Sequence, residues 1–381
     1  MNRRNLIAIL LAGSPALIAP AAHATGPQLI EFSVPGAATS ASPICGAACG
    51  TLALGINDEG TVVGSYTDAN VVPHGFIRTR DGRFLSFDAP GAGLGANLNE
   101  GTVPYSINDF GAIAGQYQDS SLVFHGFIRY PWGTFTTFDV MGAAQLAGAG
   151  TQAVSINNWG ETAGFYVDAG FASHGFVRSL NGVATSFDPD GSISTQVCLE
   201  SCLNDAGTVV GFFLDGNLVF HGFVRSRNGA LTQIDGPNAG TAAFTGTFAA
   251  SINDAGMITG YTVDDNGVGY GYVRHPGGAF SPAIEVPGAF TGVNGGIALY
   301  AINSDGTTAG AWEDSNLAFH GFTRSRDGRI TRFDAPGASD SVPFDGTRPT
   351  TINAFGEVTG WWLDVSGLNH GFVVGVPDTE D

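Results

Sequence analysis

Apolar stretches of strand length alternate along this chain with short polar turns rich in Gly, Asn and Asp. Stretches such as Phe84–Asp88 contain many β-branched or aromatic residues, which favours β-strands, and no amphipathic helix of convincing length lies between them. Gly accounts for 57 of the 381 residues, which is typical of a chain with many tight turns. The pattern predicts an all-β protein with a large buried core.

The strand-and-turn pattern is repeated seven times. Each copy opens with Ile/Leu-Asn-x-x-Gly, and seventeen residues after the Asn comes a His, replaced in the fifth copy by Tyr270. Asn-x-x-Gly between two apolar stretches is typical of a tight hairpin, in which the Asn bonds its own backbone and the Gly adopts a positive φ. Each copy then provides four short strands, a to d in chain order. The Asn residues, spaced 47 to 51 apart, are Asn57, Asn108, Asn157, Asn204, Asn253, Asn303 and Asn353.

Repeated four-stranded antiparallel units of about 40–50 residues are typical of a β-propeller. The seventh copy ends at residues 372–375 without a strand d, and residues 28–37 match a strand d that lies ahead of the first copy. We predict one seven-bladed propeller over residues 25–381, with repeats beginning near residues 50, 101, 150, 198, 247, 297 and 347. The N-terminal strand should complete the last blade, because a closed ring has no exposed sheet edges. Strand a of each copy should line the central channel.

Candidate binding residues lie where the repeat is interrupted. The connections from strand d to the next strand a vary most in length, and variable loops on a rigid scaffold commonly carry binding sites. Three residues before the Asn, near the predicted channel mouth, the copies differ, and two of them have a tyrosine that can stack on a sugar. For each candidate an ordinary exposed or gap-filling role is the alternative. The predicted ligand-binding residues are Tyr105, Tyr300, Asn99, Glu100, Glu200, Phe290, Asp340, Asp345 and Arg348.

The His-Gly-Phe sequence, together with Ile-Asn-x-x-Gly-x-x-x-Gly upstream, resembles the HAF family of bacterial extracellular repeats. That family is named for a His-Ala-Phe core that follows an Ile-Asn-x-x-Gly-x-x-x-Gly stretch, and the resemblance covers about residues 50–376. It implies an exported repeat protein and brings no reaction and no catalytic residues. This chain differs in having Gly in place of Ala and an Arg two residues after the Phe.

An Asp eleven residues after each Asn and the His that follows it flank the link between strands b and c. We interpret the two as a structural brace, bonded to each other or to the loop backbone, because a catalytic pair need occur only once. A ring of cation sites is the alternative. The brace residues are Asp68, His74, Asp119, His125, Asp168, His174, Asp215, His221, Asp264, Tyr270, Asp314, His320, Asp364 and His370.

A second recurrent pair is predicted in the hairpin of strands c and d. Arg78 follows the His-Gly-Phe of the first copy, and Asp88 ends its strand d. In the seventh copy both are replaced, by Val374 and Ser33. We therefore predict cross-strand ion pairs, each contributing ~0.2–1 kcal/mol.

The first 24 residues predict export. Arg3 and Arg4 precede an apolar stretch that ends in Ala22-His23-Ala24, which is typical of a secretory signal peptide cleaved after Ala24. We expect a periplasmic or extracellular protein without membrane insertion, because the apolar stretch is short and contains two prolines.

The four cysteines favour disulfides in an exported protein. The pairing that we predict is local, Cys45–Cys49 and Cys198–Cys202, each fixing a loop. The other two connectivities and a zinc site are the alternatives, although no His lies at metal-ligand spacing beside either pair.

Charge and motifs narrow the function. The chain has 15 basic and 34 acidic residues, a formal net charge of −19, which argues against nucleic acid and anionic membranes as partners. It contains no Lys, and no nucleophile elbow, P-loop or zinc-binding His-Glu-x-x-His. Residues 188–191 and 264–267 resemble calcium loops only in part, so we predict no cofactor, with calcium as the alternative.

Together these patterns predict a monomeric, secreted, non-enzymatic binding module. Its ligand, a carbohydrate or an extracellular protein, is expected at the loop-rich face near the channel mouth. One alternative is an extracytoplasmic hydrolase or lyase with acidic residues at that mouth. Another is an envelope scaffold without a small ligand.

Overall fold

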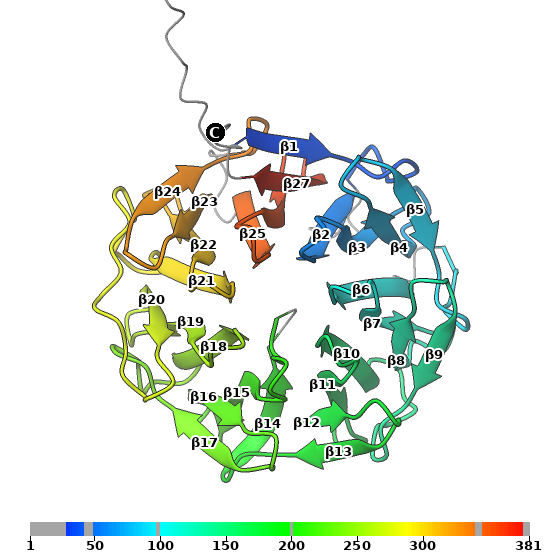
Figure 1. Ribbon diagram of the computed structural model, residues 1–381, viewed down its shortest axis with the longest axis horizontal. Helices are drawn as coiled ribbons and strands as arrows, with labels where there is room; N and C mark the ends of the chain where they lie inside the picture. Colours follow the sequence, from blue (N-terminus) through cyan, green and yellow to red (C-terminus); the bar gives the residue numbers. More distant parts are fainter. Residues whose placement is uncertain (1–27, 42–48, 97–99, 199–200, 340–344, 376–381) are drawn as a thin grey trace, which may run out of the picture.

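The computed structural model describes residues 28–41, 49–96, 100–198, 201–339 and 345–375. All regular secondary structure in these ranges is β-strand, as the sequence predicts. Figure 1 shows the strands in successive groups around a common centre, the arrangement of a β-propeller. Within the same ranges, no helix is long and apolar enough to cross a membrane.

Each repeat contributes antiparallel strands that follow one another in chain order from the centre outward (Figure 1). The strands nearest the centre are β2 (Thr51–Ile56), β6 (Gly101–Ile107), β10 (Gly150–Ile156), β14 (Ser192–Val197), β18 (Gly246–Ile252), β21 (Ile297–Ile302) and β25 (Gly346–Ile352). The second strands are β3 (Val62–Thr67), β7 (Ile113–Gln118), β11 (Thr162–Val167), β15 (Val209–Asp215), β19 (Ile258–Val263), β22 (Thr308–Glu313) and β26 (Val358–Leu363). The third strands are β4 (Pro73–Arg78), β8 (Phe124–Arg129), β12 (Ser173–Arg178), β16 (Phe220–Arg225), β20 (Gly269–Arg274), β23 (Phe319–Arg324) and β27 (Asn369–Gly375). The outer strands are β5 (Phe84–Phe87), β9 (Phe135–Phe138), β13 (Ala184–Phe187), β17 (Leu231–Ile234), β24 (Ile330–Phe333) and β1 (Gln28–Phe32).

The fifth repeat departs from the prediction of four strands. Its outer segment forms an isolated bridge between Arg274 and Phe280, followed by a hydrogen bond from Ser281 N to Val273 O. Pro282 comes next and has no N–H to donate, so the ladder cannot continue past it. The prediction of a full outer strand in this repeat was therefore wrong.

The N-terminal strand pairs with the last repeat. β1 is antiparallel to β27, from Gln28 opposite Gly375 to Phe32 opposite Gly371. Figure 1 shows β1 on the outer side of β27, where the first, second, third, fourth and sixth repeats have their own outer strand. This is the pairing that residues 28–37 predict.

One hydrogen-bond series joins the repeats at the centre. In each repeat the Asn side chain accepts, through Oδ1, the backbone N–H four residues later, as from Thr61 to Asn57. The Nδ2 group of the same Asn donates to the backbone oxygen of the Asn in the next repeat, over 2.8–3.1 Å. Asn353 donates to Asn57, so the last repeat is joined to the first. The Asn thus forms the hairpin and links the repeats.

The Phe of His-Gly-Phe forms the core between repeats. Phe76, Phe127, Phe176, Phe223, Phe322 and Phe372 are each 0% exposed. Several meet the Phe that ends the preceding outer strand, as Phe127 meets Phe87 edge-on at 6.3 Å between ring centroids. The same outer Phe explains the Gly of the motif: a Cβ on Gly75 would lie 2.7 Å from the Phe87 ring. Gly in place of Ala therefore lets the outer ring lie flat against strand c.

The Asp and His that the sequence predicts as a brace lie close together at the turn between the second and third strands. Oδ1 of Asp68 accepts the backbone N–H groups of Asn70 and Val72, and Oδ2 faces His74 Nε2 at 3.8 Å. In the other His-containing repeats this Asp–His distance is 3.3–3.8 Å. In the fifth repeat the Tyr270 hydroxyl donates to Asp264 Oδ2 over 3.3 Å, so a hydroxyl replaces the imidazole.

The predicted Arg–acid pair is wrong. The acid that ends strand d accepts instead from Nδ1 of the His, as Asp88 does from His74 at 2.9 Å. The Arg78 guanidinium lies over the Phe32 ring at 4.9 Å, a cation–π contact that recurs at Arg129, Arg178 and Arg225. In the seventh repeat Ser33 takes the place of the acid, with Oγ 2.8 Å from His370 Nδ1. The Arg and the Asp that are both absent from that repeat therefore have separate partners in the other repeats: an aromatic ring for the Arg and the His for the acid.

Replacing Asn57 by Ala should lower the free energy of unfolding by about 2–3 kcal/mol, because two hydrogen bonds of a buried side chain are lost and the part-buried N–H of Thr61 is left without its acceptor. Chemical denaturation measures the change. Glu59→Ala, at an exposed position of the same turn, is the control and should change stability by under about 0.5 kcal/mol. Equal effects of the two substitutions would contradict the role assigned to the Asn series.

The braces should make stability depend on pH. The hydrogen bond to Asp88 raises the pKa of His74, and that to Asp334 raises the pKa of His320. This stabilisation is complete below the ordinary His pKa of 6.5 and is lost as pH rises through the raised folded-state pKa. We therefore expect the denaturant concentration at the midpoint of unfolding to decrease as the pH is raised from about 6 to about 8.

In the double variant that carries both His74→Gln and His320→Gln, this decrease of the denaturation midpoint should be smaller than in the wild type. His275→Gln, at an exposed turn, is the control and should leave the fall unchanged. A midpoint that is constant or rises over this range would contradict the assignment.

Candidate functional site

The end of the channel at the Asn turns is a narrow, polar hollow of about 180 Å³. It is lined by turn residues that recur at the same position in successive repeats, including Asp58, Asp109, Asn158, Asp205 and Asp254. Their side-chain oxygens accept backbone N–H groups of neighbouring repeats, as Asp109 does from Asp58 N at 3.0 Å. Burial, with the nearby carboxylates of Asp109 and Glu357, raises the pKa of Asp58. These oxygens are thus part of the framework.

No metal site is formed by the side chains that the structure describes. Across these residues, no three or more His, Cys, Asp or Glu side chains are placed to hold a metal ion. The Asp and His braces of separate repeats each remain local to their own turn. The alternative of a ring of cation sites therefore has no geometric support among them.

A second, larger hollow of about 560 Å³ lies along the channel beyond the Asn turns. It is bordered by β11, β14, β15, β18, β19, β21, β25 and β26, and so by the third to the seventh repeats. We call it the aromatic hollow and define it by eight side chains. They are Phe165, Phe212, Phe248, Tyr261, Tyr300, Trp361, Gln196 and Arg348.

The aromatic rings of this hollow contact one another in series. Phe212 meets Phe248 edge-on at 5.1 Å, and Phe248 stacks on Tyr261 at 4.8 Å with an interplanar angle of 14°. Tyr261 in turn meets Tyr300 edge-on at 6.3 Å. Rings that support one another in this way form a rigid apolar wall with polar hydroxyl tips.

Charged groups lie beside the aromatic wall. The guanidinium of Arg348 lies 3.8 Å from the centroid of the Phe319 ring and 5.1 Å from that of Trp361. Burial raises the pKa of Glu313 to about 7, against the opposing effects of a backbone N–H and of Arg348. Burial likewise raises the pKa of Asp345, which Ser339 and Arg348 oppose. Burial also raises the pKa values of the two tyrosines, that of Tyr261 to about 12.

A short insertion in the fourth repeat lies between the two hollows. Val197 opposite Gly211 corresponds to Ala153 opposite Gly164, but six residues separate Val197 from its Asn and only three separate Ala153 from its own. Cys198 borders the aromatic hollow, whereas Ser201 borders the narrow one. The described ends of the insertion, Cys198 and Ser201, thus border different hollows.

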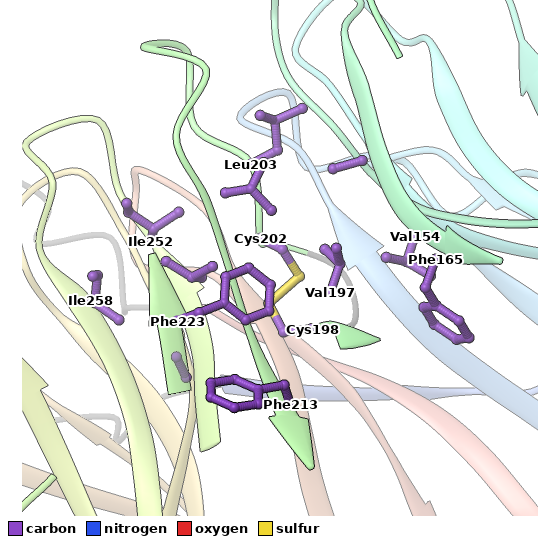
Figure 2. Packing of buried hydrophobic residues seen from close by; sticks show 14 of the residues in the cluster. Val154, Phe165, Val197, Cys198, Cys202, Leu203, Phe213, Phe223, Ile252 and Ile258 are labelled. Carbon is purple, nitrogen blue, oxygen red and sulfur yellow. A yellow bond between two sulfur atoms is a disulfide. The ribbon is translucent and has the colours of Figure 1, made fainter. Parts of the chain in front are cut away.

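The predicted disulfide between Cys198 and Cys202 closes this insertion and is confirmed. Figure 2 shows it within a packed cluster that includes Val197 and Phe223. The backbone N–H of Cys202 donates to Ser155 Oγ at 3.2 Å, which anchors the insertion to the third repeat. Cys49 is also disulfide-bonded, but Cys45 lies outside the described residues, so that pairing stays a prediction.

Three of the predicted ligand-binding residues meet at the aromatic hollow. Tyr300 and Arg348 line it, and Asp345 lies close enough to Arg348 for the guanidinium to oppose the rise in its pKa. The backbone oxygen of Asp345 also accepts the N–H of Phe319, the residue beneath Arg348.

The other predicted residues lie elsewhere. Tyr105 is half-buried and packs against the core of the fourth repeat. Glu100 is 2% exposed and accepts the backbone N–H of Gly95 in its own loop. The Phe290 ring covers Gly292 and Gly295, in its own loop. Asn99, Glu200 and Asp340 lie outside the described residues.

Sequence reasoning missed most of the aromatic hollow. Phe165, Phe212, Tyr261 and Trp361 all lie eight residues after the Asn of their repeats, where the other repeats have Ser65, Gln116 and Ala311. Phe248 and Arg348 both lie five residues before theirs. These positions vary strongly within an otherwise regular repeat, and that variation was the available signal.

Comparison with known proteins supports the fold. No family model matches the chain, and no curated protein matches it. Among solved structures, the BP39L lectin of Burkholderia pseudomallei is similar, with a TM-score of 0.53 and 11% identity over 83% of this chain and 92% of that one. A fucose-recognising six-bladed β-propeller lectin of Aleuria aurantia has a TM-score of 0.43 and 14% identity, over 73% of this chain and 92% of its own. Both of these structures are of lectins.

Proposed function

We propose that this protein is a non-enzymatic carbohydrate-binding module whose ligand enters the aromatic hollow. The observation that carries the proposal is the wall of six aromatic side chains with polar groups at its edge, Gln196 and Arg348. Sugars present apolar C–H faces and hydroxyl edges, so a site for them combines flat rings with a few polar groups. The similar fold of the B. pseudomallei lectin is consistent with this use of a propeller.

The hydrolase alternative has less support. Glu100, one of the acids expected at the channel mouth, is turned into its own loop. Glu313 has a raised pKa, as catalytic acids often do, but it faces Arg348 and two tyrosines, an arrangement that also suits a binding site.

We further propose that the protein is exported and that it is a His-Gly-Phe variant of the HAF repeats. The confirmed disulfide supports an oxidising compartment, and the sequence of residues 1–24 supports a signal peptide. The Asn, Gly and His-Gly-Phe spacing supports the family.

The complete architecture that we propose is a seven-bladed ring closed by β1. Two contacts support it: the ladder between β1 and β27, and the hydrogen bond from Asn353 to Asn57. The Thr350 hydroxyl also donates to Ala53 O over 3.1 Å.

The binding proposal predicts that Trp361→Ala weakens glycan binding at least about tenfold, because a ring of the aromatic wall is lost. A glycan array identifies the ligand, and titration calorimetry measures its affinity. Trp159→Ala is the control, since Trp159 is 65% exposed and lies on the turn that follows its repeat's Asn. If glycan arrays show no binding while a protein partner binds and depends on Trp361, the ligand is a protein instead.

The closure proposal predicts that Phe32→Ala destabilises the protein by about 2–4 kcal/mol. Phe32 contacts Phe76 at 6.1 Å and lies under Arg78, so it joins the last sheet to the first. Ile30→Ala on the same strand is the control, because Ile30 is 48% exposed, and it should cost under about 1 kcal/mol. Equal costs, measured by chemical denaturation, would argue against a closing role for β1.

A further inference from the structure

The wall of the aromatic hollow is built from residues that lie opposite one another on the first and second strands of a repeat. In the fourth repeat Gln196 of β14 lies opposite Phe212 of β15, and in the fifth Phe248 of β18 lies opposite Tyr261 of β19. Residues that are opposite in an antiparallel ladder lie on the same face of the sheet. Both pairs border the hollow, so each of these repeats presents a pair of side chains to it.

The sixth repeat contributes to the wall in a different way. At the equivalent places it has Ala298 opposite Ala311, and its aromatic side chain comes instead from Tyr300. The register of β21 shifts across Tyr300, which is therefore the extra residue of a β-bulge, a feature that re-aims a side chain. The Tyr300 ring meets the Tyr261 ring of the preceding repeat. The wall thus continues from one repeat to the next.

Three polar side chains of this wall have hydrogen-bonding groups that the protein does not use. Within the described residues, the hydroxyls of Tyr261 and Tyr300 and the side-chain amide of Gln196 make no hydrogen bond. In contrast to the indole N–H groups of Trp312 and Trp362, these groups are not enclosed in the core. Polar groups of this kind bond to water or to a ligand. Beside an aromatic wall they match the hydroxyl edges and apolar faces of sugar rings.

The aromatic hollow is larger than one sugar. Its volume of about 560 Å³ falls within the range of sites that enclose drug-sized ligands, about 300–1,000 Å³. A hexose has about a dozen non-hydrogen atoms, and a drug-sized ligand has roughly two or three times as many. The aromatic lining also extends over several repeats, from Phe165 of the third to Trp361 of the seventh. Volume and extent therefore both match a ligand of about two or three linked sugars.

We propose that the aromatic hollow binds an oligosaccharide with more than one sugar residue on the wall, oriented by hydrogen bonds to Gln196, Tyr261 and Tyr300. This inference rests on the proposed carbohydrate-binding function and specifies the size of the ligand and the residues that select it. The sugar rings lie along the wall from Phe212 to Tyr300, because each ring contact there continues into the next.

The test of ligand size uses the full chain and sugars of increasing length. Methyl glycosides and oligosaccharides of about one to four units, from the cellulose, chitin and mannan series, are titrated by calorimetry. Affinity should rise about tenfold with the second unit, because the added ring covers more of the wall. It should change by less than about threefold beyond the third unit, because the hollow is then filled.

Variants that lose one polar group test the residues. Tyr261→Phe and Tyr300→Phe keep the rings and should each weaken binding of the trisaccharide about three- to tenfold, as should Gln196→Met. None of these changes should lower the denaturation midpoint, because the lost groups make no hydrogen bond within the described residues. Tyr270→Phe is the matched control: its hydroxyl donates to Asp264 at a turn outside the hollow, so this variant should leave the affinity unchanged.

The outcomes separate this inference from the proposed function. A monosaccharide that binds as tightly as its own trimer would overturn the inference and leave the proposed function intact. Folded tyrosine variants that bind the trisaccharide as tightly as the wild type would also overturn it. If none of the three series binds, the same comparison is made with the glycan that a wider array identifies and with its monosaccharide. An array on which no glycan binds would overturn both proposals.

Discussion

The hydrogen-bond series of the seven Asn side chains is the constraint on which the structure depends. The oxygen of each Asn side chain accepts a hydrogen bond within its own hairpin, and its N–H₂ group donates to the next repeat. The same side chain therefore stabilises the turn and aligns neighbouring sheets. All seven are buried. A buried amide costs free energy unless its donors and acceptors are satisfied, and in every repeat the neighbouring repeat provides an acceptor for Nδ2. The spacing inside a repeat is therefore fixed, whereas the loops between repeats are free to vary.

That constraint explains where a binding site can form. Close to the Asn turns the inner strands are held together and their side-chain oxygens serve the neighbouring backbone, so the space there is narrow. Several side chains five residues before the Asn or eight residues after it line the aromatic hollow, and the residue type at these positions varies from repeat to repeat. Large rings occupy these positions in several repeats, and Cys198 of the fourth repeat's disulfide borders the same hollow. The aromatic hollow thus uses the part of each repeat that the framework leaves open.

The sequence alone indicated the strands, the Asn turns, the Asp and His brace, the local disulfide and the pairing of β1 with the last repeat, because each follows from spacing or from turn chemistry. It misassigned the acid of strand d, since both His74 and Arg78 lie on the strand opposite Asp88 and spacing does not choose between them. The structure shows why His is chosen: the Arg side chain extends over Phe32 of the preceding sheet. The aromatic hollow was also missed, because Tyr261 and Trp361 come from different repeats and are brought to one hollow by the packing of the sheets, which no local sequence pattern records.

If all repeats were identical, each would present the same residues to the channel. The residues that differ between repeats therefore indicate where a single binding site can form. Tyr261 and Phe248 come from the fifth repeat, the one that also has Tyr270 in place of His and a single bridge in place of the outer strand. A His at position 270 would have no acid on an outer strand to bond its Nδ1, and so would keep only one of the two partners that it has in other repeats. The hydroxyl of Tyr270 makes that remaining contact, with Asp264. The first and second repeats have Ser65 and Gln116 where the fifth has Tyr261. Among the described residues, the lining of the hollow comes from the third to the seventh repeats, so the hollow is one-sided, which favours one ligand beside the aromatic wall over one on each repeat.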